Sequence, residues 1–289
     1  MIKDAICGFC MALADSVPGV SGGTVAFILG FYDQFIGSIH NFLFGKRKTK
    51  KEALQYLVKL GIGWCCGMVL AILVLSALFE RRIYTISSVF LGFIAGSIPL
   101  IVMDERESFR EIKKGLGFGI AGMAVVVGID WMNGQGATSA MDLSQFSIIL
   151  GVRLFLIGMI AISAMFLPGV SGSTLLLIFG AYIPVITAVK GFLGLNFSYL
   201  PCLMFFGFGV LAGAMTVVKG IQVCLKKFRP QSVYAILGMM IGSFYAIVQG
   251  PTTLEVPKAA MNATTFQPLA CLLGVAIVLG MQKLKEKGE

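Results

Sequence analysis

Two short segments of this chain repeat almost the same run of small and hydroxyl-bearing residues. The first motif, residues 18–24, reads Pro-Gly-Val-Ser-Gly-Gly-Thr, and the second motif, residues 168–174, reads Pro-Gly-Val-Ser-Gly-Ser-Thr. Glycine allows a ligand to approach the backbone closely, and a hydroxyl group can donate a hydrogen bond. Where such a run opens a helix, unpaired backbone N–H groups and the helix dipole favour an anion. We therefore predict that the two motifs form an anion-binding site.

The candidate ligands of this anion are the serine, threonine and glycine residues of both motifs: Ser21, Gly22, Gly23, Thr24, Ser171, Gly172, Ser173 and Thr174. Each helix start carries about half a positive charge, so two opposed starts match a monoanion. A phosphate monoester carries about −1.5 to −2 charges at neutral pH. Binding the dianion would therefore need a further basic side chain or a proton.

Three charged residues could complete such a site. Lys3 and Arg153 each lie fifteen residues before the proline of a motif, which is about 22 Å along a helix. They are candidate entrance charges for the anion, and the alternative is that they are interfacial anchors that snorkel toward water. Asp15 lies just before the first motif, where the second half has Met165. It is either a proton carrier, because protonation would remove its repulsion of an anion, or a structural residue that acts as an N-cap or accepts a loop N–H.

A serine hydrolase is a weaker interpretation of the same residues. Residues 19–23 fit the pattern Gly-x-Ser-x-Gly. A serine nucleophile needs a general base, and the one histidine, His40, has no counterpart in the second half. We expect His40 to be a solvated residue at the membrane interface. Cys7 and Cys10 lie in an apolar run without the strand and helix of a redox motif. We predict no catalytic residue, no cofactor and no metal.

The composition is that of a polytopic membrane protein. The chain of 289 residues is 57% hydrophobic and 13% charged, with a mean hydropathy of +0.90, whereas a soluble domain carries roughly 25% charged residues. The net charge of +9 does not indicate a nucleic-acid partner, because the charges lie in short loops between spans that contact membrane lipids. The N-terminus resembles a signal peptide, but we expect it to be retained, because a matching stretch leads into the second motif.

The similarity between the two halves extends beyond the motifs. Glycines recur at a spacing of 146 residues, at positions 61, 63, 67, 92 and 96 and again at 207, 209, 213, 238 and 242. Small residues at such spacings allow membrane helices to approach closely, so we assign these glycines to packing. The chain divides into a first repeat, residues 1–144, and a second repeat, residues 145–289, within a single membrane domain.

Each repeat is predicted to contain a re-entrant hairpin and three transmembrane helices, giving an all-α fold. Arms over 4–16 and 146–166 lead into the motifs, and short helices over 22–32 and 172–182 lead out. Eleven helical residues cover about 16 Å, half of the ~30 Å hydrocarbon core, so each motif would lie near the midplane. Asp33-Gln34 and Pro184 would end the short helices, and 35–45 and 185–195 would follow the interface. The predicted spans are 53–79, 83–103, 113–130, 200–222, 232–250 and 267–282.

Three crossings per repeat would make the two repeats inverted relative to each other. With the N-terminus inside, 18 of the 23 Lys and Arg residues fall on the inner side and 4 on the outer side, and Arg153 remains in an arm. Basic residues collect on the cytoplasmic side, so both termini are predicted to be cytoplasmic. The loop 131–144 would be external and the basic loop 46–51 internal. Broken helices at matching points of two halves are typical of a transporter's binding site.

The motifs and their flanks resemble a known family. The run 14–24, the later Gly30-Phe31-Tyr32-Asp33 and the run 165–173 are similar to bacterial polyprenyl-phosphate transporters of the PopT type, formerly a family of unknown function. The family often has Glu where this chain has Asp33, so the acid is kept. The resemblance covers nearly the whole chain. It implies that the chain returns undecaprenyl phosphate, the lipid carrier of cell-wall and surface glycans, to the inner leaflet of the bacterial cytoplasmic membrane.

Two other functions remain open from the residues alone. A small-anion channel or exchanger could use the same inverted repeats and helix starts, and a lateral opening wide enough for a lipid would distinguish the two. A lipid-binding or assembly protein without transport would lack a site that is reachable from both sides. The sequence leaves open the coupling ion, the resting conformation and the oligomeric state, a homo-oligomer included.

Overall fold

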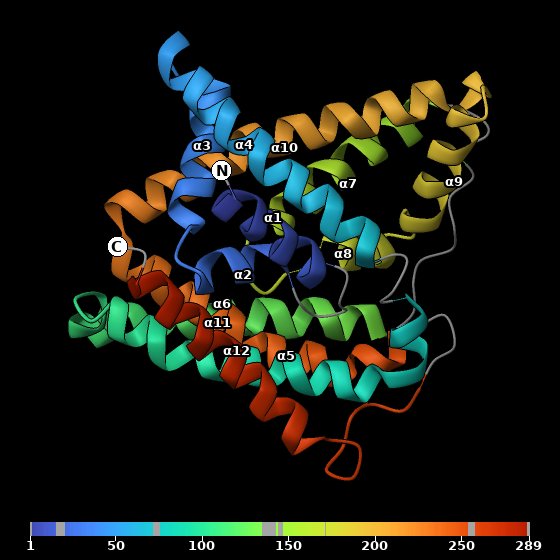
Figure 1. Cartoon of the computed structure of the whole chain (residues 1–289). Coiled ribbons are helices and arrows are strands. Elements are labelled where there is room, and N and C mark those ends of the chain that lie inside the picture. The colour runs from blue at the N-terminus through green and yellow to red at the C-terminus, as the bar shows by residue number, and fades with distance from the viewer. Residues whose placement is uncertain are drawn as a thin grey trace.

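The structure describes residues 2–15, 21–71, 76–134, 143, 147–170, 172–253 and 258–287, and the regular secondary structure within them is helical. The structure is a computed structural model of the whole chain (Figure 1). Within these ranges the α-helices are α1 Ile2–Asp15, α2 Gly22–Ile28, α3 Tyr32–Phe44, α4 Arg47–Leu70, α5 Ser76–Asp104, α6 Ile112–Gly134, α7 Ile148–Phe166, α8 Gly172–Ile178, α9 Tyr182–Leu193, α10 Leu200–Lys227, α11 Arg229–Gln249 and α12 Pro268–Lys287.

Six segments of the described chain are long and apolar enough to cross a membrane: Arg47–Leu70, Arg82–Asp104, Gly115–Met132, Ile148–Phe166, Phe197–Lys227 and Arg229–Thr252. Large apolar side chains on their outer faces are exposed, among them Ile149 on α7, Phe118 on α6 and Leu211 on α10. Apolar side chains in such positions contact lipid in a membrane-spanning helix. The prediction of an all-helical, polytopic membrane protein is therefore confirmed.

Two of the predicted spans differ from the observed helices. The predicted span 53–79 differs from the observed helix, because α4 already begins at Arg47 and its 24 residues end at Leu70, after about 36 Å of helix. Residues 72–75 of the predicted span lie outside the described residues. The next helix, α5, begins at Ser76 and has a non-helical residue at Arg82, where the apolar span starts. The arm before the second motif, α7, is itself long enough to cross the membrane, whereas the apolar part of α12, Pro268–Gly280, is shorter than a full span.

The short helices of the motifs end earlier than predicted. Both α2 and α8 contain seven residues, and each is followed by a glycine with positive φ, Gly30 at 74° and Gly180 at 66°. Such glycines end helices, and here the N–H of Phe31 bonds to the carbonyl of Ala26. Asp33-Gln34 and Pro184 therefore do not end these helices. They lie in the first turns of α3 and α9, where a proline loses no helical hydrogen bond.

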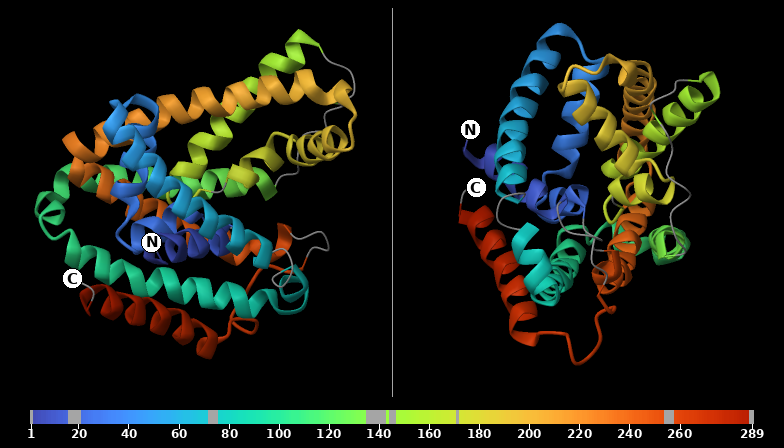
Figure 2. Two further views of the ribbon diagram at one scale, coloured as in Figure 1. Left: turned by 45° about the horizontal axis from the view of Figure 1, so that its top comes forward. Right: turned by 90° about the vertical axis from the view of Figure 1, so that its right-hand side faces the viewer.

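Helix packing follows the same scheme in both halves of the chain. The first helix of each half packs along the fourth, α1 on α4 and α7 on α10. The last two helices of each half pack against the other half, with α5 along α12 and α6 along α11. Figure 1 shows α5, α6, α11 and α12 as one layer, with α1, α2 and α8 between it and the layer that holds α4, α7 and α10. Figure 2 shows α5 and α12 side by side along their lengths.

The glycines that recur at a spacing of 146 residues lie mostly at these helix crossings. A Cβ atom at Gly63 would lie 1.8 Å from the carbonyl oxygen of Ala5, and one at Gly209 would lie 2.0 Å from that of Phe155. Gly238 is in the same position against Gly119 O, at 1.9 Å. The prediction that these glycines serve packing is therefore confirmed at these crossings. It is wrong for one matched pair, Gly61 and Gly207, because both face open space.

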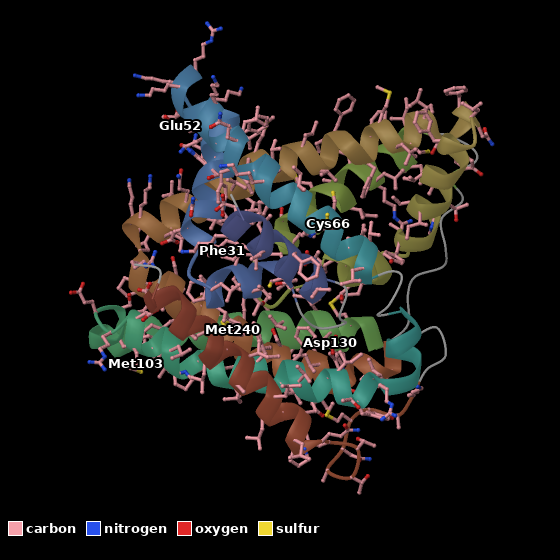
Figure 3. The ribbon with its side chains drawn as sticks, in the orientation of Figure 1. Phe31, Glu52, Cys66, Met103, Asp130 and Met240 are labelled. Atoms are coloured by element: carbon pink, nitrogen blue, oxygen red, sulfur yellow. The ribbon has the colours of Figure 1, made fainter. Side chains whose placement is uncertain are left out.

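The buried core lies where the layers meet around the short helices. Its side chains come from both halves and include Tyr32, Ile94 and Met240, each at most 2% exposed. In Figure 3, Phe31 and Met240 mark this interior, while Glu52 lies far from it toward the outer end of α4. The core therefore holds the ends of the two motif helices in a fixed relation to each other.

Candidate functional site

The two motifs meet in the interior, although about 145 residues separate them in the sequence. The hydroxyl groups of Ser21 and Thr24 both accept the N–H of Gly169, at 3.2 Å and 2.7 Å. Ser21 also donates to the carbonyl oxygen of Leu167 at 3.3 Å. Both hydroxyl residues are at most 2% exposed. The side chains of the first motif are therefore bonded to the backbone of the second.

Two further side chains fix this junction. The hydroxyl of Tyr32 donates to the carbonyl oxygen of Phe166 at 2.8 Å. Ser243 of α11 donates to Met239 O at 3.0 Å and lies 3.4 Å from Gly169 O. Gly169 itself has φ of +84°, a conformation that favours glycine. The backbone around Gly169 is thus held from two sides, by α2 and by α11.

The start of α2 is occupied by a carboxylate of the chain itself. Asp15, the last residue of α1, accepts the N–H of Gly22 at 2.6 Å and the indole Nε1–H of Trp64 at 3.0 Å. Ser21, the N-cap of α2, accepts the N–H of Thr24. Asp15 therefore makes the bond to a motif N–H that was its alternative role in the sequence analysis. Trp64 was not predicted, because nothing in the sequence links residues 49 positions apart.

A cavity of about 390 Å³ lies beside this carboxylate. Its wall includes Asp15, the hydrogen-bond partners of Asp15, which are Gly22 and Trp64, and the adjacent Gly23. The rest of its wall is apolar apart from Cys65, and it comes from α1, α3, α4 and α7: Met11, Phe35, Ile39, Leu57, Leu60, Gly61, Ile162, Met165 and Phe166. The cavity therefore joins the first motif to a compartment suited to hydrocarbon.

The predicted residues of the second motif are placed less completely. Gly172 begins α8, and a Cβ atom there would lie 2.9 Å from Ala161 O. Thr174 is half-buried on α8. Ser171 and the side chain of Ser173 lie outside the described residues, as do residues 16–20 of the first motif and its flank. Thr174 and Gly172 are not part of the wall of the 390 Å³ cavity.

The two candidate entrance charges lie on the surface. Lys3 is exposed in the first turn of α1, and Arg153 is exposed near the start of α7. Neither is part of the cavity wall. His40 is half-buried on α3 against the ring of Phe44, with ring centroids 5.2 Å apart, and is not a solvated residue as predicted.

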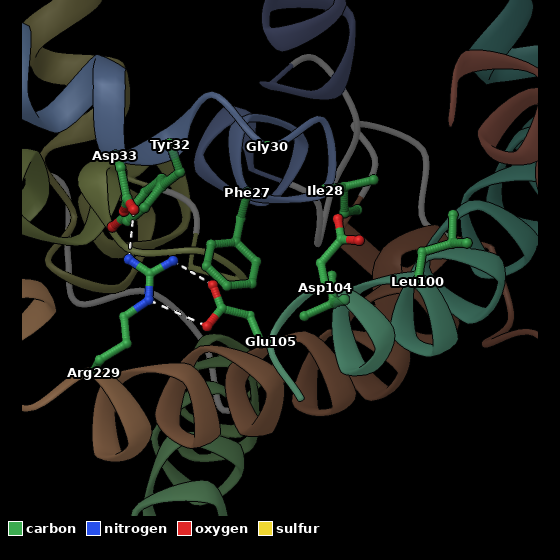
Figure 4. Close-up of a pocket in the computed structure, with 10 residues that line it drawn as sticks. Phe27, Ile28, Gly30, Tyr32, Asp33, Leu100, Asp104, Glu105 and Arg229 are labelled. Carbon is green, nitrogen blue, oxygen red and sulfur yellow. Dashed lines mark hydrogen bonds and ion pairs between the residues drawn. The ribbon is translucent and has the colours of Figure 1, made fainter. Parts of the chain in front are cut away.

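A second pocket, of about 190 Å³, contains a charged cluster that sequence reasoning missed (Figure 4). Arg229 at the start of α11 bonds to Glu105 with two of its nitrogens and to Asp33 with a third. Asp104 also lines this pocket. Arg229 is 124 positions from Glu105 and 196 from Asp33. No spacing rule connects residues so far apart, so only the fold could show this cluster.

Comparisons with known proteins assign the chain to a family. The family model described as undecaprenyl phosphate translocase-like matches residues 11–265. A polyprenyl-phosphate transporter of Staphylococcus aureus is 38% identical over 252 residues, which is 86% of this chain and 86% of the relative. A polyprenyl-phosphate transporter of Vibrio cholerae is 29% identical over 314 aligned positions, covering 97% of this chain and 96% of the relative. No solved structure matches the chain.

These matches confirm the resemblance that the motifs indicated, and they concern transporters rather than enzymes. The family match spans both motifs, both pockets and the helices that form them. The chain therefore belongs to the undecaprenyl phosphate translocase-like family of bacterial multi-pass membrane proteins.

Proposed function

We propose that this protein moves undecaprenyl phosphate across the bacterial cytoplasmic membrane and so recycles the lipid carrier of cell-wall and surface glycans. The observation that carries the proposal is the largely apolar cavity with Asp15, Gly22 and Trp64 at one end. A lipid phosphate needs a polar and an apolar compartment side by side, whereas a small anion needs only the first. The family match and both relatives named above support the same substrate.

We further propose that residues 1–144 and 145–289 are inverted repeats and that each motif is the tip of a re-entrant hairpin. The equal order of helices in the two halves supports the repeat, as does the matched packing of α5 on α12 and α6 on α11. The distribution of Lys and Arg supports cytoplasmic termini. Single cysteines in the loops 46–51 and 131–144, labelled in intact cells with an impermeant thiol reagent, test this. Only the 131–144 cysteine should react, and equal labelling would contradict the topology.

The phosphate is proposed to bind at the starts of the two motif helices. Gly22, Gly23 and Gly172 would offer backbone N–H groups, and Ser21, Thr24, Ser171, Ser173 and Thr174 would offer hydroxyl groups. Arg153 would contact the phosphate at the entrance, before it reaches the motifs. In the structure Ser21 and Thr24 are bonded to the second motif, and Asp15 is bonded to Gly22. The substrate would therefore compete with hydrogen bonds that these residues make within the protein, so a bound phosphate would replace some of their partners.

Asp15 is the proposed proton carrier. Among the described residues that line the 390 Å³ cavity, it is the only carboxylate, and Cys65 is the only other titratable group. A protonated Asp15 would no longer repel an incoming phosphate. Inward movement of negative charge against an inside-negative potential costs about 2.3 kcal/mol per charge per 100 mV. A proton that travels with the lipid reduces this cost. Lys3 and Arg153 would attract the headgroup at the two membrane faces.

Transport of the lipid in proteoliposomes tests the proposed function. Undecaprenyl phosphate in the outer leaflet can be measured by its hydrolysis with an impermeant phosphatase. Purified protein should move the lipid between leaflets. Because a proton is proposed to travel with the lipid, transport should be faster from the acidic side to the alkaline side. Chloride flux without lipid movement would favour the small-anion channel. If the protein moved neither chloride nor the lipid, a transport function would be contradicted. Lipid movement that ignores the pH gradient would remove the proton coupling and leave a passive scramblase.

A further inference from the structure

The residues that line the cavity of about 390 Å³ beside the first motif indicate which part of a lipid it could hold. Three aromatic side chains, Phe35, Trp64 and Phe166, stand in its wall among aliphatic residues. The apolar part of this wall offers water no hydrogen-bond partners, although the volume of the cavity equals that of roughly a dozen waters at about 30 Å³ each. Its lining therefore favours an apolar occupant.

We propose that this cavity binds the isoprene units adjacent to the phosphate of the polyprenyl phosphate. The inference rests on the proposed function. Three polar groups of the wall lie together, because the Gly22 N–H and Trp64 Nε1–H both donate to the Asp15 carboxylate, and this part of the wall would face the phosphate. The branched, unsaturated units next to it would lie against the aromatic side chains. A chain with one polar terminus matches this distribution of polar and apolar groups, and a small hydrophilic anion does not.

The exposed residues of the cavity wall lie on α4 and α7, so the cavity would open to the bilayer between these two helices. Across this opening, Cys65 of α4 and Met165 of α7 are both exposed. In the described part of the chain α4 and α7 are not among the closely packed helix pairs. Gly61 lies in the wall between them, and no atom lies within 4 Å of the position that a Cβ would take there. The remaining length of the lipid would leave through this gap into the bilayer.

The second half offers a matched position that lies outside this cavity. At the spacing of 146 residues Gly207 on α10 corresponds to Gly61, and it also faces open space. Its neighbours differ, because Val210 stands where the first half has Trp64, and Met165 stands where it has Asp15. A bulky residue at Gly207 would therefore have the same helical context as one at Gly61 but would not enter the cavity.

The test compares Gly61→Phe, Gly61→Ala and Gly207→Phe in proteoliposomes, with undecaprenyl phosphate as the transported lipid. Gly61→Phe should lower the initial rate about ten-fold at low lipid content, equal to roughly 1.4 kcal/mol. Gly61→Ala and Gly207→Phe should retain most of the wild-type rate. Normal transport by Gly61→Phe would overturn the tail site while leaving the proposed function intact. A wild-type protein that does not move the lipid would instead contradict the proposed function itself.

A second measurement on the wild-type protein does not depend on the folding of a variant. A farnesyl phosphate with a diazirine on its first isoprene unit is photolysed with the protein in nanodiscs, and labelled peptides are identified by mass spectrometry. Labels should lie in the α4 segment 57–65 and the α7 segment 162–166, and excess undecaprenyl phosphate should remove them. Labels found only on other helices would overturn the inference.

Discussion

The two motifs have nearly the same sequence, yet they contribute different atoms to the place where they meet. The first motif provides side chains, since Ser21 and Thr24 bond across to the second. Among the described residues, the second motif provides the N–H of Gly169, and Leu167 just before it provides a carbonyl. The residues just before them differ too, because Asp15 is bonded to the start of α2, whereas the equivalent Met165 is exposed in the cavity wall.

This difference teaches that the neighbours of a repeated motif decide its role. Trp64 orients Asp15 in the first half, and Val210 occupies the equivalent position in the second. The near-symmetry of the sequence therefore yields one site whose two sides are not equivalent. Substitutions at equivalent positions should have unequal effects, and three such comparisons follow from the geometry, together with one between a strained and an unstrained glycine.

The largest effect is expected for Gly169→Val. Gly169 has φ of +84°, and a Cβ atom there would lie 2.6 Å from Met239 O and 2.8 Å from Ser243 Oγ. Backbone strain and this contact together should lower the free energy of unfolding on the order of 3 kcal/mol or more. Thermal unfolding in detergent micelles measures the loss. Gly207→Val, at a glycine that faces open space, serves as the control, and equal melting temperatures would contradict the assigned role of Gly169.

Thr24→Val should cost less, because only a hydrogen bond is removed. The hydroxyl of Thr24 accepts the buried Gly169 N–H at 2.7 Å, and valine keeps the shape of the side chain without the acceptor. The expected loss is about 1–3 kcal/mol. Thr174→Val, at the half-buried equivalent in α8, should cost clearly less. If the two valine variants unfold at the same temperature, the two motifs are more alike than the contacts indicate.

Asp15→Asn should change the pH response of transport more than the stability of the fold. A carboxylate accepts both the Gly22 N–H and the Trp64 Nε1–H, whereas an asparagine has only one accepting oxygen for them. It also cannot carry a proton. Inward transport by the native protein should rise when the outside is acidified, and the variant should respond weakly. An unchanged pH dependence in the variant would assign the proton to another group. Met165→Asp shows whether a carboxylate at the equivalent position introduces a second response.

The smallest effect is expected at the two surface charges. Arg153→Ala should slow capture of the lipid from the outer face more than Lys3→Ala does. Both side chains are exposed, so each change should alter rates by less than about ten-fold, as for screened surface charges. Initial rates at two salt concentrations provide the measurement. Rates that are insensitive to salt in the wild-type protein would mean that neither residue acts as an entrance charge.

Much of the fold could be predicted because it depends on local patterns. Apolar runs located the spans 83–103, 113–130, 200–222 and 232–250 close to the observed helices. The recurring glycines were correctly assigned to packing at Gly63 and Gly209. The ends of α2 and α8 were placed too late, because the left-handed glycines Gly30 and Gly180 were not recognised as stop signals.

The site could be predicted only in part, because its contacts join distant segments. The sequence indicated which residues of the motifs are polar, but it could not show that Ser21 and Thr24 are bonded to Gly169. It likewise could not pair Asp15 with Trp64, or Arg229 with Asp33 and Glu105. These partners are set by helix packing, which leaves no spacing pattern for a reader of one sequence.

The packing of α5 and α6 against helices of the second half has a consequence for biogenesis. Helix α6 ends at Gly134, but its partner α11 begins only at Arg229, 95 residues later. At about 5–20 residues per second, a ribosome needs roughly 5–20 s to complete that interval. During this time Gly119 and Gly122 of α6 lack the residues of α11 that they face in the folded protein. Membrane insertion of the first half therefore precedes its assembly, and the late helices complete a protein whose early helices are already in the bilayer.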